Sequence, residues 1–380
     1  MDIFKNNDKK VEYIELIYDL IFVYIIGRNN SILVDADGGF LNVQSVAAYL
    51  LCTLAVIQIW NYTTFYINMF GRNSIRDHVF LFINMYLLYF VGESTRPEWQ
   101  SYQTQYHVAW GLILVNIAIQ FLIELRNHRD RDWNADIIKR MAGMLFVEAA
   151  VVFAAAVPVP ELALPLSAAA IGISMVLTVF HRKRSPGEQI DFKHMSERAM
   201  LFVVFTFGEM IITVASYFAG DGSWDWSVIY FSAMTFIIVV ALFLSYEVIY
   251  NHMIDRDGDH DGLSYLVIHI FIIFCMNNIT ASLEFMRRAD IALLPKIAFL
   301  LASMIGYFAF LLCLYRFTKK KCRPGRRLLL TAAAATAVFA VTMLIFRGQM
   351  QINILISVLY VFFMFLLIYK LGKGDAKKGC

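Results

Sequence analysis

The chain has 380 residues, of which 59% are apolar and 17% charged, with a formal net charge of +3 and a mean hydropathy of +0.60. Soluble domains are usually about 45–50% apolar. Apolar stretches of about 20 residues, long enough to cross a bilayer, recur along the whole length. This composition excludes a soluble globular domain and predicts an all-α, multi-pass membrane protein.

The apolar stretches predict about twelve membrane-spanning helices. In chain order they cover residues 11–27, 43–69, 75–93, 105–125, 138–157, 161–180, 197–219, 227–250, 262–286, 291–316, 328–346 and 350–370. The segments between them are short, so the sequence leaves no room for a sizeable soluble domain.

Charge predicts how the helices are oriented. If the N-terminus lies in the cytoplasm, most of the 33 Lys and Arg residues fall on the cytoplasmic side, as the positive-inside rule requires. We therefore expect both termini in the cytoplasm and the protein in the plasma membrane. The basic loop "RFTKKKCRPGRR" (316–327) suits contact with anionic lipid headgroups, and we expect no nucleic-acid role for it.

A second basic loop, residues 181–194, divides the chain into two predicted six-helix halves, 1–182 and 183–380. Polar residues hold matching places in the two halves: Glu15 and Glu197, and Asp77-His78 and Asp259-His260. Because each half has an even number of spans, both halves would start in the cytoplasm. This pattern suggests a 6+6 parallel pseudo-repeat, which some secondary transporters have.

The first predicted span, "VEYIELIYDLIFVY" (11–24), carries the carboxylates Glu12, Glu15 and Asp19. At 100° per residue they fall within about 60° of one another, so the helix has an acidic face. Glu12 and Glu15 suit the positive end of the helix dipole. Asp19 lies about 12 Å further in than Val11, at 1.5 Å per residue. A carboxylate at this depth is either paired or functional, and both interpretations stay open.

Two later spans also have polar faces. In 197–219, Arg198 and Glu209 share a face, and Arg198 is suited to pair with a carboxylate of the first span. Gly208, beside Glu209, is expected to admit a close neighbouring helix. In 262–286, His269 and Asn277 share a face, and His269 either relays protons or makes an interhelical hydrogen bond.

Other polar and aromatic residues have simpler interpretations. Three aromatic residues of the second span suit the membrane-interface belt: Trp60, Tyr62 and Tyr66. Four titratable residues near span ends are expected to reach solvent: Glu93, His107, Glu124 and Glu247. Glu148, in 138–157, is a buried carboxylate whose partner the sequence does not indicate.

The sequence contains none of the common nucleophile, phosphate-binding or metal-binding motifs. There is no Walker A loop, G-x-S-x-G or H-E-x-x-H, and no Cys/His cluster has zinc spacing. We therefore predict no enzyme activity, no cofactor and no metal site.

Three segments resemble the bacterial low-temperature-requirement A family of multi-pass membrane proteins: "ELIYDLIFVY" (15–24), "IWNYTTFYINMFGR" (59–72) and "HMSERAMLFVVFTFGE" (194–209). The residues that carry the resemblance are Glu15, Leu16, Asp19, Leu20, Phe22, Trp60, His194, Glu197, Arg198, Gly208 and Glu209. Ile17-Tyr18 departs from the aromatic residues usual there. The resemblance implies a bacterial membrane protein linked to growth in the cold, rather than one particular biochemical activity.

The favoured functional hypothesis is a secondary transporter. Glu15, Asp19 and Glu209 would form a proton- or cation-responsive centre between the halves, and Arg198, His269 and Asn277 would complete the path. An ion channel lined by the same residues is one alternative. A structural or signalling protein, in which the carboxylates only pair with Arg198, is another. The expected partners are the lipid bilayer and a small solute or ion; the sequence names neither the solute nor an oligomeric state.

Overall fold

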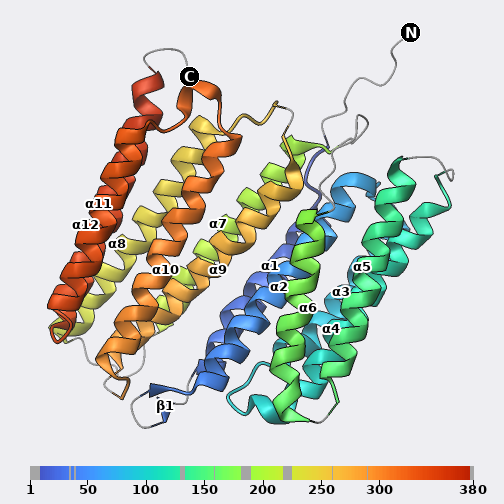
Figure 1. The fold of residues 1–380 in the computed structure, drawn as a ribbon, viewed down its shortest axis with the longest axis horizontal. Helices are drawn as coiled ribbons and strands as arrows, with labels where there is room; N and C mark the ends of the chain where they lie inside the picture. Colours follow the sequence, from blue (N-terminus) through green and yellow to red (C-terminus); the bar gives the residue numbers. More distant parts are fainter. Residues whose placement is uncertain are drawn as a thin grey trace. The chain divides into compact units, whose positions relative to one another are not determined.

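The computed structural model describes residues 9–33, 36–37, 40–128, 133–157, 159–180, 190–216, 225–258, 260–288 and 290–376 (Figure 1). These residues form α-helices α1 (Tyr13–Arg28), α2 (Val43–Phe70), α3 (Ile75–Glu93), α4 (Trp99–Leu125), α5 (Trp133–Ala155), α6 (Pro160–Phe180), α7 (Phe192–Ser216), α8 (Trp226–Val248), α9 (Gly262–Arg287), α10 (Leu293–Cys313), α11 (Arg326–Ile345) and α12 (Met350–Ala376). The strands β1 (Ala36–Asp37) and β2 (Phe40–Leu41) pair between α1 and α2.

Short irregular helices extend several of these elements. They are η1 (Asn29–Leu33) after α1, the π-helical turn η2 (Ile249–Met253) after α8, and η3 (Leu314–Phe317) and η4 (Lys320–Cys322) after α10. The prediction of an all-helical membrane protein is therefore confirmed.

Each predicted span has a corresponding helix, but not all of these helices are equally apolar. Among the described residues, nine helices are long and apolar enough to cross a membrane by length and composition. The others are α3, α5 and α6. Charged residues of α5, such as Lys139 and Arg140, explain why α5 is less apolar than the nine. That all twelve cross the membrane stays a prediction.

The chain forms two compact units. The first contains residues 1–35, 41–202 and 261–270, and the second contains residues 36–40, 203–260 and 271–380. The helices α7 and α9 therefore contribute one end to each unit. Within the second unit α12 packs against α8 and α11, and α10 packs against α11. The pseudo-repeat and its division at residue 182 stay predictions, and Asp259 lies outside the described residues.

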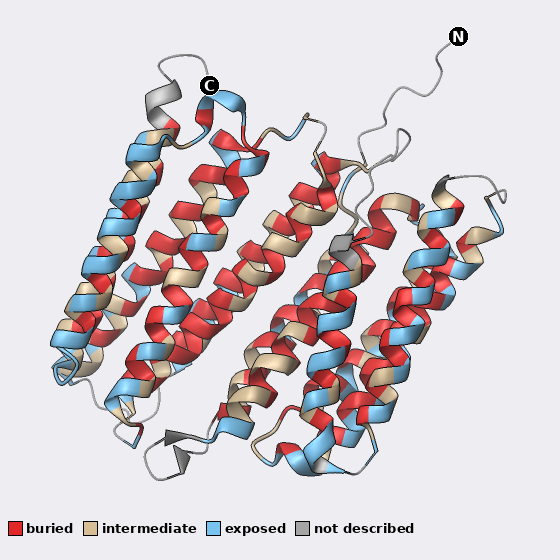
Figure 2. Cartoon of the chain, in the orientation of Figure 1, coloured by how far each residue is buried: buried red, intermediate tan, exposed pale blue. Residues whose placement is uncertain are grey.

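Within the first unit, α2 is the central helix. Every residue from Ala55 to Asn68 is buried, because α1, α4 and α6 all pack against α2. Figure 2 shows the buried residues on the helix faces that meet other helices. The pair α4 and α5 approaches closely at Gly111, where a Cβ atom would lie 2.6 Å from a ring carbon of Phe153. A larger residue at Gly111 would force these two helices apart.

The turn between α2 and α3 has clear local causes. A Cβ atom on Gly71 would lie 2.7 Å from the carbonyl oxygen of Ile67, so only glycine fits there. Asn73 adopts a positive φ of 51°, which asparagine tolerates better than most residues. Ser74 and Asp77 then form a capping box that satisfies the first amides of α3.

Lys9 completes the end of α2. Its ammonium donates to the carbonyl oxygen of Gly71 at 2.7 Å and to that of Ile67. A cation at this position also complements the negative end of the helix dipole. Burial lowers the pKa of Lys9, and the carboxylates of Glu15 and Asp191 oppose this shift.

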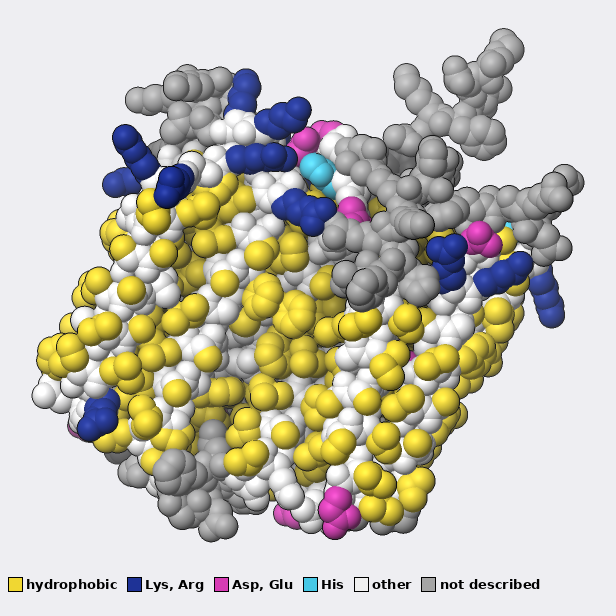
Figure 3. Space-filling model, in the orientation of Figure 1, with side chains coloured by type: hydrophobic (Ala, Val, Ile, Leu, Met, Phe, Trp, Pro, Cys, Tyr) yellow, Lys and Arg dark blue, Asp and Glu magenta, His cyan; other side chains and the backbone are white. Residues whose placement is uncertain are grey.

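The outer surface agrees with a membrane setting. On the face that Figure 3 shows, hydrophobic side chains cover the middle of the helices, and most Lys and Arg side chains gather near the helix ends. On α1, Ile17 and Leu20 point outward and are 55% and 50% exposed.

Two groups of predictions are wrong. Trp60, Tyr62 and Tyr66 do not lie in an exposed interface belt. All three are buried inside the first unit, where Trp60 donates to Asp19, Tyr62 donates to Glu148, and Tyr66 accepts from Arg76. Glu124 and His107 do not reach solvent either and are 0% and 1% exposed.

The span count can be tested through the location of the C-terminus. Twelve spans place the C-terminus in the cytoplasm with the N-terminus, whereas nine spans would place it outside. We expect alkaline phosphatase fused after residue 380 to be inactive, and the same enzyme fused between α11 and α12, after Gly348, to be active. Activity of the C-terminal fusion would contradict the twelve-span topology.

Candidate functional site

Six polar or charged side chains from three helices meet inside the first unit. We call this group the α1–α2–α7 cluster. Each of its members is at most 4% exposed, and they are Glu15, Asp19, Trp60, Asn68, His194 and Arg198.

Arg198 is at the centre of the cluster. Its Nη2 atom lies 2.7 Å from Oδ1 of Asp19, and its Nη1 atom lies 3.3 Å from Oε2 of Glu15. The indole Nε1 of Trp60 also donates to Oδ1 of Asp19, at 2.7 Å. The fully buried guanidinium thus faces two carboxylates, and one of them has a second donor.

The spacing of residues along the helices explains why these groups meet. Glu15 and Asp19 are four residues apart on α1, and His194 and Arg198 are four residues apart on α7, so each pair lies on one helix face. Where these faces of α1 and α7 meet, the acidic pair contacts the basic pair. This part of the site could be inferred from the sequence.

The start of α7 is fixed to α2. The backbone N–H of His194 donates to the carboxylate of Asp191 at 2.9 Å, and Asn68 Nδ2 donates to the Asp191 carbonyl oxygen at 2.8 Å. Asn68 Nδ2 also lies 3.2 Å from Nδ1 of His194. A buried amide that bridges α2 and α7 therefore holds the His194 ring in place.

These contacts assign the tautomer of His194. Because Asn68 Nδ2 is a donor, the nearby Nδ1 atom of His194 acts as the acceptor, and the ring proton is on Nε2. Nε2 lies 3.6 Å from Oε2 of Glu15. The Nε2–H of His194 is thus directed towards Glu15.

The cluster contains two carboxyl groups and one guanidinium. Glu15 and Asp19 both face Arg198, so they share one cation. Oε2 of Glu15 and Oδ2 of Asp19 have no hydrogen-bond partner among the described residues. Lys9, which also acts electrostatically on Glu15, is bound to the end of α2. Two buried carboxylate oxygens of the cluster are therefore left without a donor among the described residues, which is costly in an apolar interior.

Aromatic rings close one side of the cluster. The ring of Phe202 stacks on Trp60 with a centroid distance of 4.3 Å, and the Arg198 guanidinium lies 6.0 Å from the Trp60 ring centroid. The rings shield the Asp19–Arg198 pair from water and lipid, so that this interaction operates in a low dielectric. The sequence indicated Trp60 only through the family motif, and its contact with Asp19 was not predicted.

The remaining predicted site residues lie elsewhere. Glu209 belongs to the second unit, where its Oε1 accepts from the hydroxyl of Thr213 at 3.0 Å. Asn277 is also in the second unit and is buried. His269 is in the first unit, fully buried, with Nδ1 2.8 Å from the carbonyl oxygen of Tyr265. The structure does not bring these residues into the α1–α2–α7 cluster, and their roles stay predictions.

The family-motif residues differ in their placement. Phe22 is buried against Tyr18, with ring centroids 4.8 Å apart, whereas Leu20 is exposed and Leu16 and Glu197 are half-buried. Gly208 is exposed, and a Cβ atom there would meet no atom of the described residues within 4 Å. The expectation that Gly208 admits a close neighbouring helix is therefore wrong.

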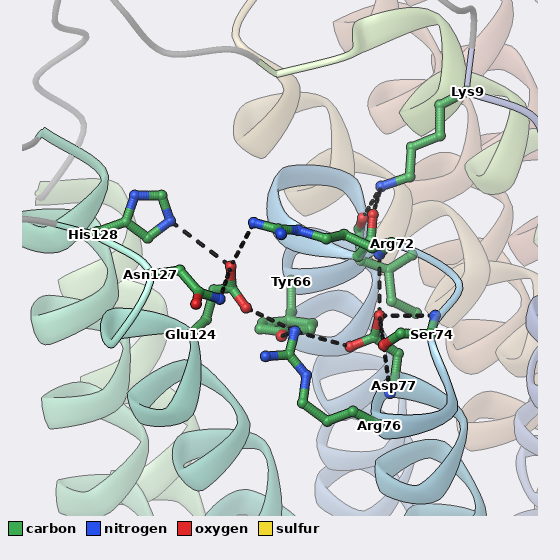
Figure 4. A network of polar contacts seen from close by, with 11 residues as sticks. Lys9, Tyr66, Arg72, Ser74, Arg76, Asp77, Glu124, Asn127 and His128 are labelled. Atoms are coloured by element: carbon green, nitrogen blue, oxygen red, sulfur yellow. Dashed lines mark hydrogen bonds and ion pairs between the residues drawn. The ribbon is translucent and has the colours of Figure 1, made fainter.

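A second charged network, which sequence reasoning missed, lies at the end of α2, α3 and α4 (Figure 4). Buried Glu124 binds Arg76 at 2.7 Å and Arg72 at 3.1 Å, and Asn127 donates to the same carboxylate at 3.0 Å. Arg76 also lies 3.4 Å from Asp77 of the capping box. The network fastens the α2–α3 turn to the end of α4. The sequence held two signals of this network: Arg72 and Arg76 between two predicted spans, and Glu124 near the end of another.

A chain of neutral polar groups connects the first four helices. Tyr18 contacts the hydroxyl of Thr63 at 3.1 Å and accepts from Asn84 at 3.3 Å. Asn116 donates to Asn84 at 2.9 Å. The interior of the first unit is thus polar along α1, α2, α3 and α4, although its outer faces are apolar.

Long apolar helices that bury charged residues on their inner faces define a multi-pass helical membrane protein. The family model of the bacterial low temperature requirement A protein (LtrA) matches residues 10–364, and the chain belongs to this family. No curated protein and no solved structure matches the chain.

Substitution of Arg198 tests the energetic role of the cluster. Arg198→Gln leaves two buried carboxylates without their cation, and we expect a loss of about 3–5 kcal/mol in the free energy of unfolding. Glu197→Gln, one residue away and half-buried, is the matched control and should change it by less than about 0.5 kcal/mol. Equilibrium unfolding in mixed micelles measures both. A similar small change for the two variants would contradict the central role of Arg198.

The second network gives a contrast between a buried and an exposed partner. Glu124→Gln leaves two arginines without their shared carboxylate, and we expect a loss of about 1.5–3 kcal/mol. The Arg72 side chain is 64% exposed, so Arg72→Gln should cost less than about 1 kcal/mol. Both losses are measured in the same unfolding assay. A larger loss for Arg72→Gln than for Glu124→Gln would show that the network does not depend on Glu124.

Proposed function

We propose that this protein is a proton-coupled secondary transporter of the bacterial plasma membrane, with both termini in the cytoplasm. The observation that supports this function is that two buried carboxyl groups, Glu15 and Asp19, share one guanidinium in the α1–α2–α7 cluster. Two carboxylates that share one cation repel each other, so the pair binds a proton more readily than a carboxylate with a cation of its own.

In this mechanism Glu15 is the group that gains and loses the proton. When Glu15 is ionised, Arg198 is held by both carboxylates of α1. When Glu15 is protonated, its attraction to Arg198 Nη1 is lost and the shorter pair with Asp19 remains. Protonation thus changes the free energy of one α1–α7 packing relative to another, which is how a bound proton can bias a conformational equilibrium.

The other residues have supporting roles. Asp19, bound by Arg198 and Trp60, keeps the guanidinium in place through the cycle. His194 directs its Nε2–H towards Glu15 and so favours the ionised form of that carboxyl group. Glu209, His269 and Asn277 are further candidates for the solute or proton path. The transported solute is a small molecule or ion whose identity the residues do not specify.

Proteoliposomes with an imposed pH gradient test this function. A panel of small solutes is added in turn, and a trapped pH dye reports solute-dependent proton movement. We expect at least one solute to dissipate the gradient with wild type and with Glu197→Gln. We expect Glu15→Gln to be slower by at least about tenfold, equivalent to about 1.4 kcal/mol.

Two outcomes would contradict the proposal. Folded Glu15→Gln with wild-type coupled flux would remove Glu15 from the mechanism. Fast proton movement under a potassium-diffusion potential with no solute present would favour a channel instead.

The pairing of Asp19 supports a second candidate, a membrane protein in which the cluster only holds helices together. Oδ1 of Asp19 has two donors, Arg198 and Trp60, as a purely structural carboxylate would. This candidate predicts that Asp19→Asn and Arg198→Gln lower stability while wild type moves no solute in the same panel.

A further inference from the structure

A second group of buried polar side chains lies on the opposite side of α2. Gln58 and Tyr62 are two residues before and after Trp60, so at 100° per residue they face away from the α1–α2–α7 cluster. They meet Glu148 of α5 and Ser174 of α6. All four side chains are at most 3% exposed.

The hydrogen bonds of this group form a single chain. Gln58 Nε2 donates to the hydroxyl oxygens of both Tyr62 and Ser174. The Tyr62 hydroxyl donates to Oε2 of Glu148 at 2.8 Å. The Ser174 hydroxyl lies near the carboxyl as well, but it donates to the carbonyl oxygen of Ala170 at 3.0 Å.

Every donor of the group is therefore used, and two acceptors are left over. Oε1 of Glu148 and Oε1 of Gln58 are buried and have no hydrogen-bond partner among the described residues. A buried polar atom without a partner costs roughly 1–3 kcal/mol, and more if it carries charge. The group lacks one proton donor, and a proton on Glu148 would supply it.

The charge around Glu148 leads to the same conclusion. Tyr62 is the titratable group that contacts it, and the packed helices α4 and α6 bring no charged side chain against it within the part of the chain that the structure describes. An ionised carboxylate with no cation in a dry interior is strongly disfavoured. Unlike Asp19, Glu148 has no arginine partner among the residues that the structure describes.

We propose that Glu148, Gln58, Tyr62 and Ser174 form a second proton-binding site, in which the Glu148 carboxyl group carries a proton at neutral pH. Oε2, which accepts from Tyr62, is the carbonyl oxygen of this acid, and the proton is on Oε1. The first unit thus has two titratable centres, one on each side of α2, and they differ in that only the α1–α2–α7 cluster contains a cation. This inference depends on the geometry of α2, α5 and α6 and does not require that the protein transports a solute.

Infrared spectroscopy of the protein in lipid bilayers tests the proposal directly. A protonated carboxyl group has a C=O stretching band that an ionised carboxylate lacks. We expect the spectrum of wild type at neutral pH to contain this band and Glu148→Gln to lose it. Glu197→Gln, which removes a half-buried carboxylate, is the control and should leave the band unchanged.

A second variant keeps the test valid if Glu148→Gln does not fold. Tyr62→Phe keeps the carboxyl group but removes the hydrogen bond to Oε2, so we expect the band to move to higher frequency. The proposal is overturned if the Glu148→Gln difference shows loss of ionised carboxylate bands only, or if the band is present but does not respond to Tyr62→Phe. Neither result depends on solute transport, so failure here and failure of the transport assay are distinguishable.

Discussion

The burial of the Arg198 guanidinium inside an apolar protein determines how α1, α2 and α7 pack in the first unit. Arg198 is fully buried, and a charge without a partner at such a depth would cost several kcal/mol. Its partner Asp19 lies 179 residues earlier in the sequence, on the same helix as Glu15, so the pairing fixes α1 against α7. Trp60 and Asn68 extend the same constraint to α2.

The polar interior is arranged around α2, which has no lipid-exposed face over its buried length. One side of α2 contacts the charged cluster, the other contacts Glu148, and its end is closed by Lys9 and linked to α3 and α4 by the Glu124 network. The three centres have different partners: two carboxyl groups share Arg198 in the charged cluster, Glu148 has the proposed proton, and Glu124 contacts Arg72 and Arg76.

The sequence predicted the helices well, because a run of about 20 apolar residues has few alternatives to a membrane helix. It also predicted which residues share a face, so the Glu15–Asp19 and Arg198 pairing could be anticipated. Periodicity does not tell which neighbouring helix a face meets. For that reason Trp60 and Tyr62 were assigned to an interface belt, Glu124 was assigned to solvent, and the partners of Glu148 were not found. The prediction for Gly208 was wrong for the same reason, because a small residue permits close packing but does not show that a neighbouring helix is present.

The most direct test of this account is a double-mutant cycle between Asp19→Asn and Arg198→Gln, measured as the free energy of unfolding. If the two groups form the buried ion pair that holds α1 against α7, the double variant should be more stable than the sum of the single losses implies, with a coupling energy of about 1–3 kcal/mol. Additive losses, within about 0.5 kcal/mol, would show that Asp19 and Arg198 act independently and would contradict the account.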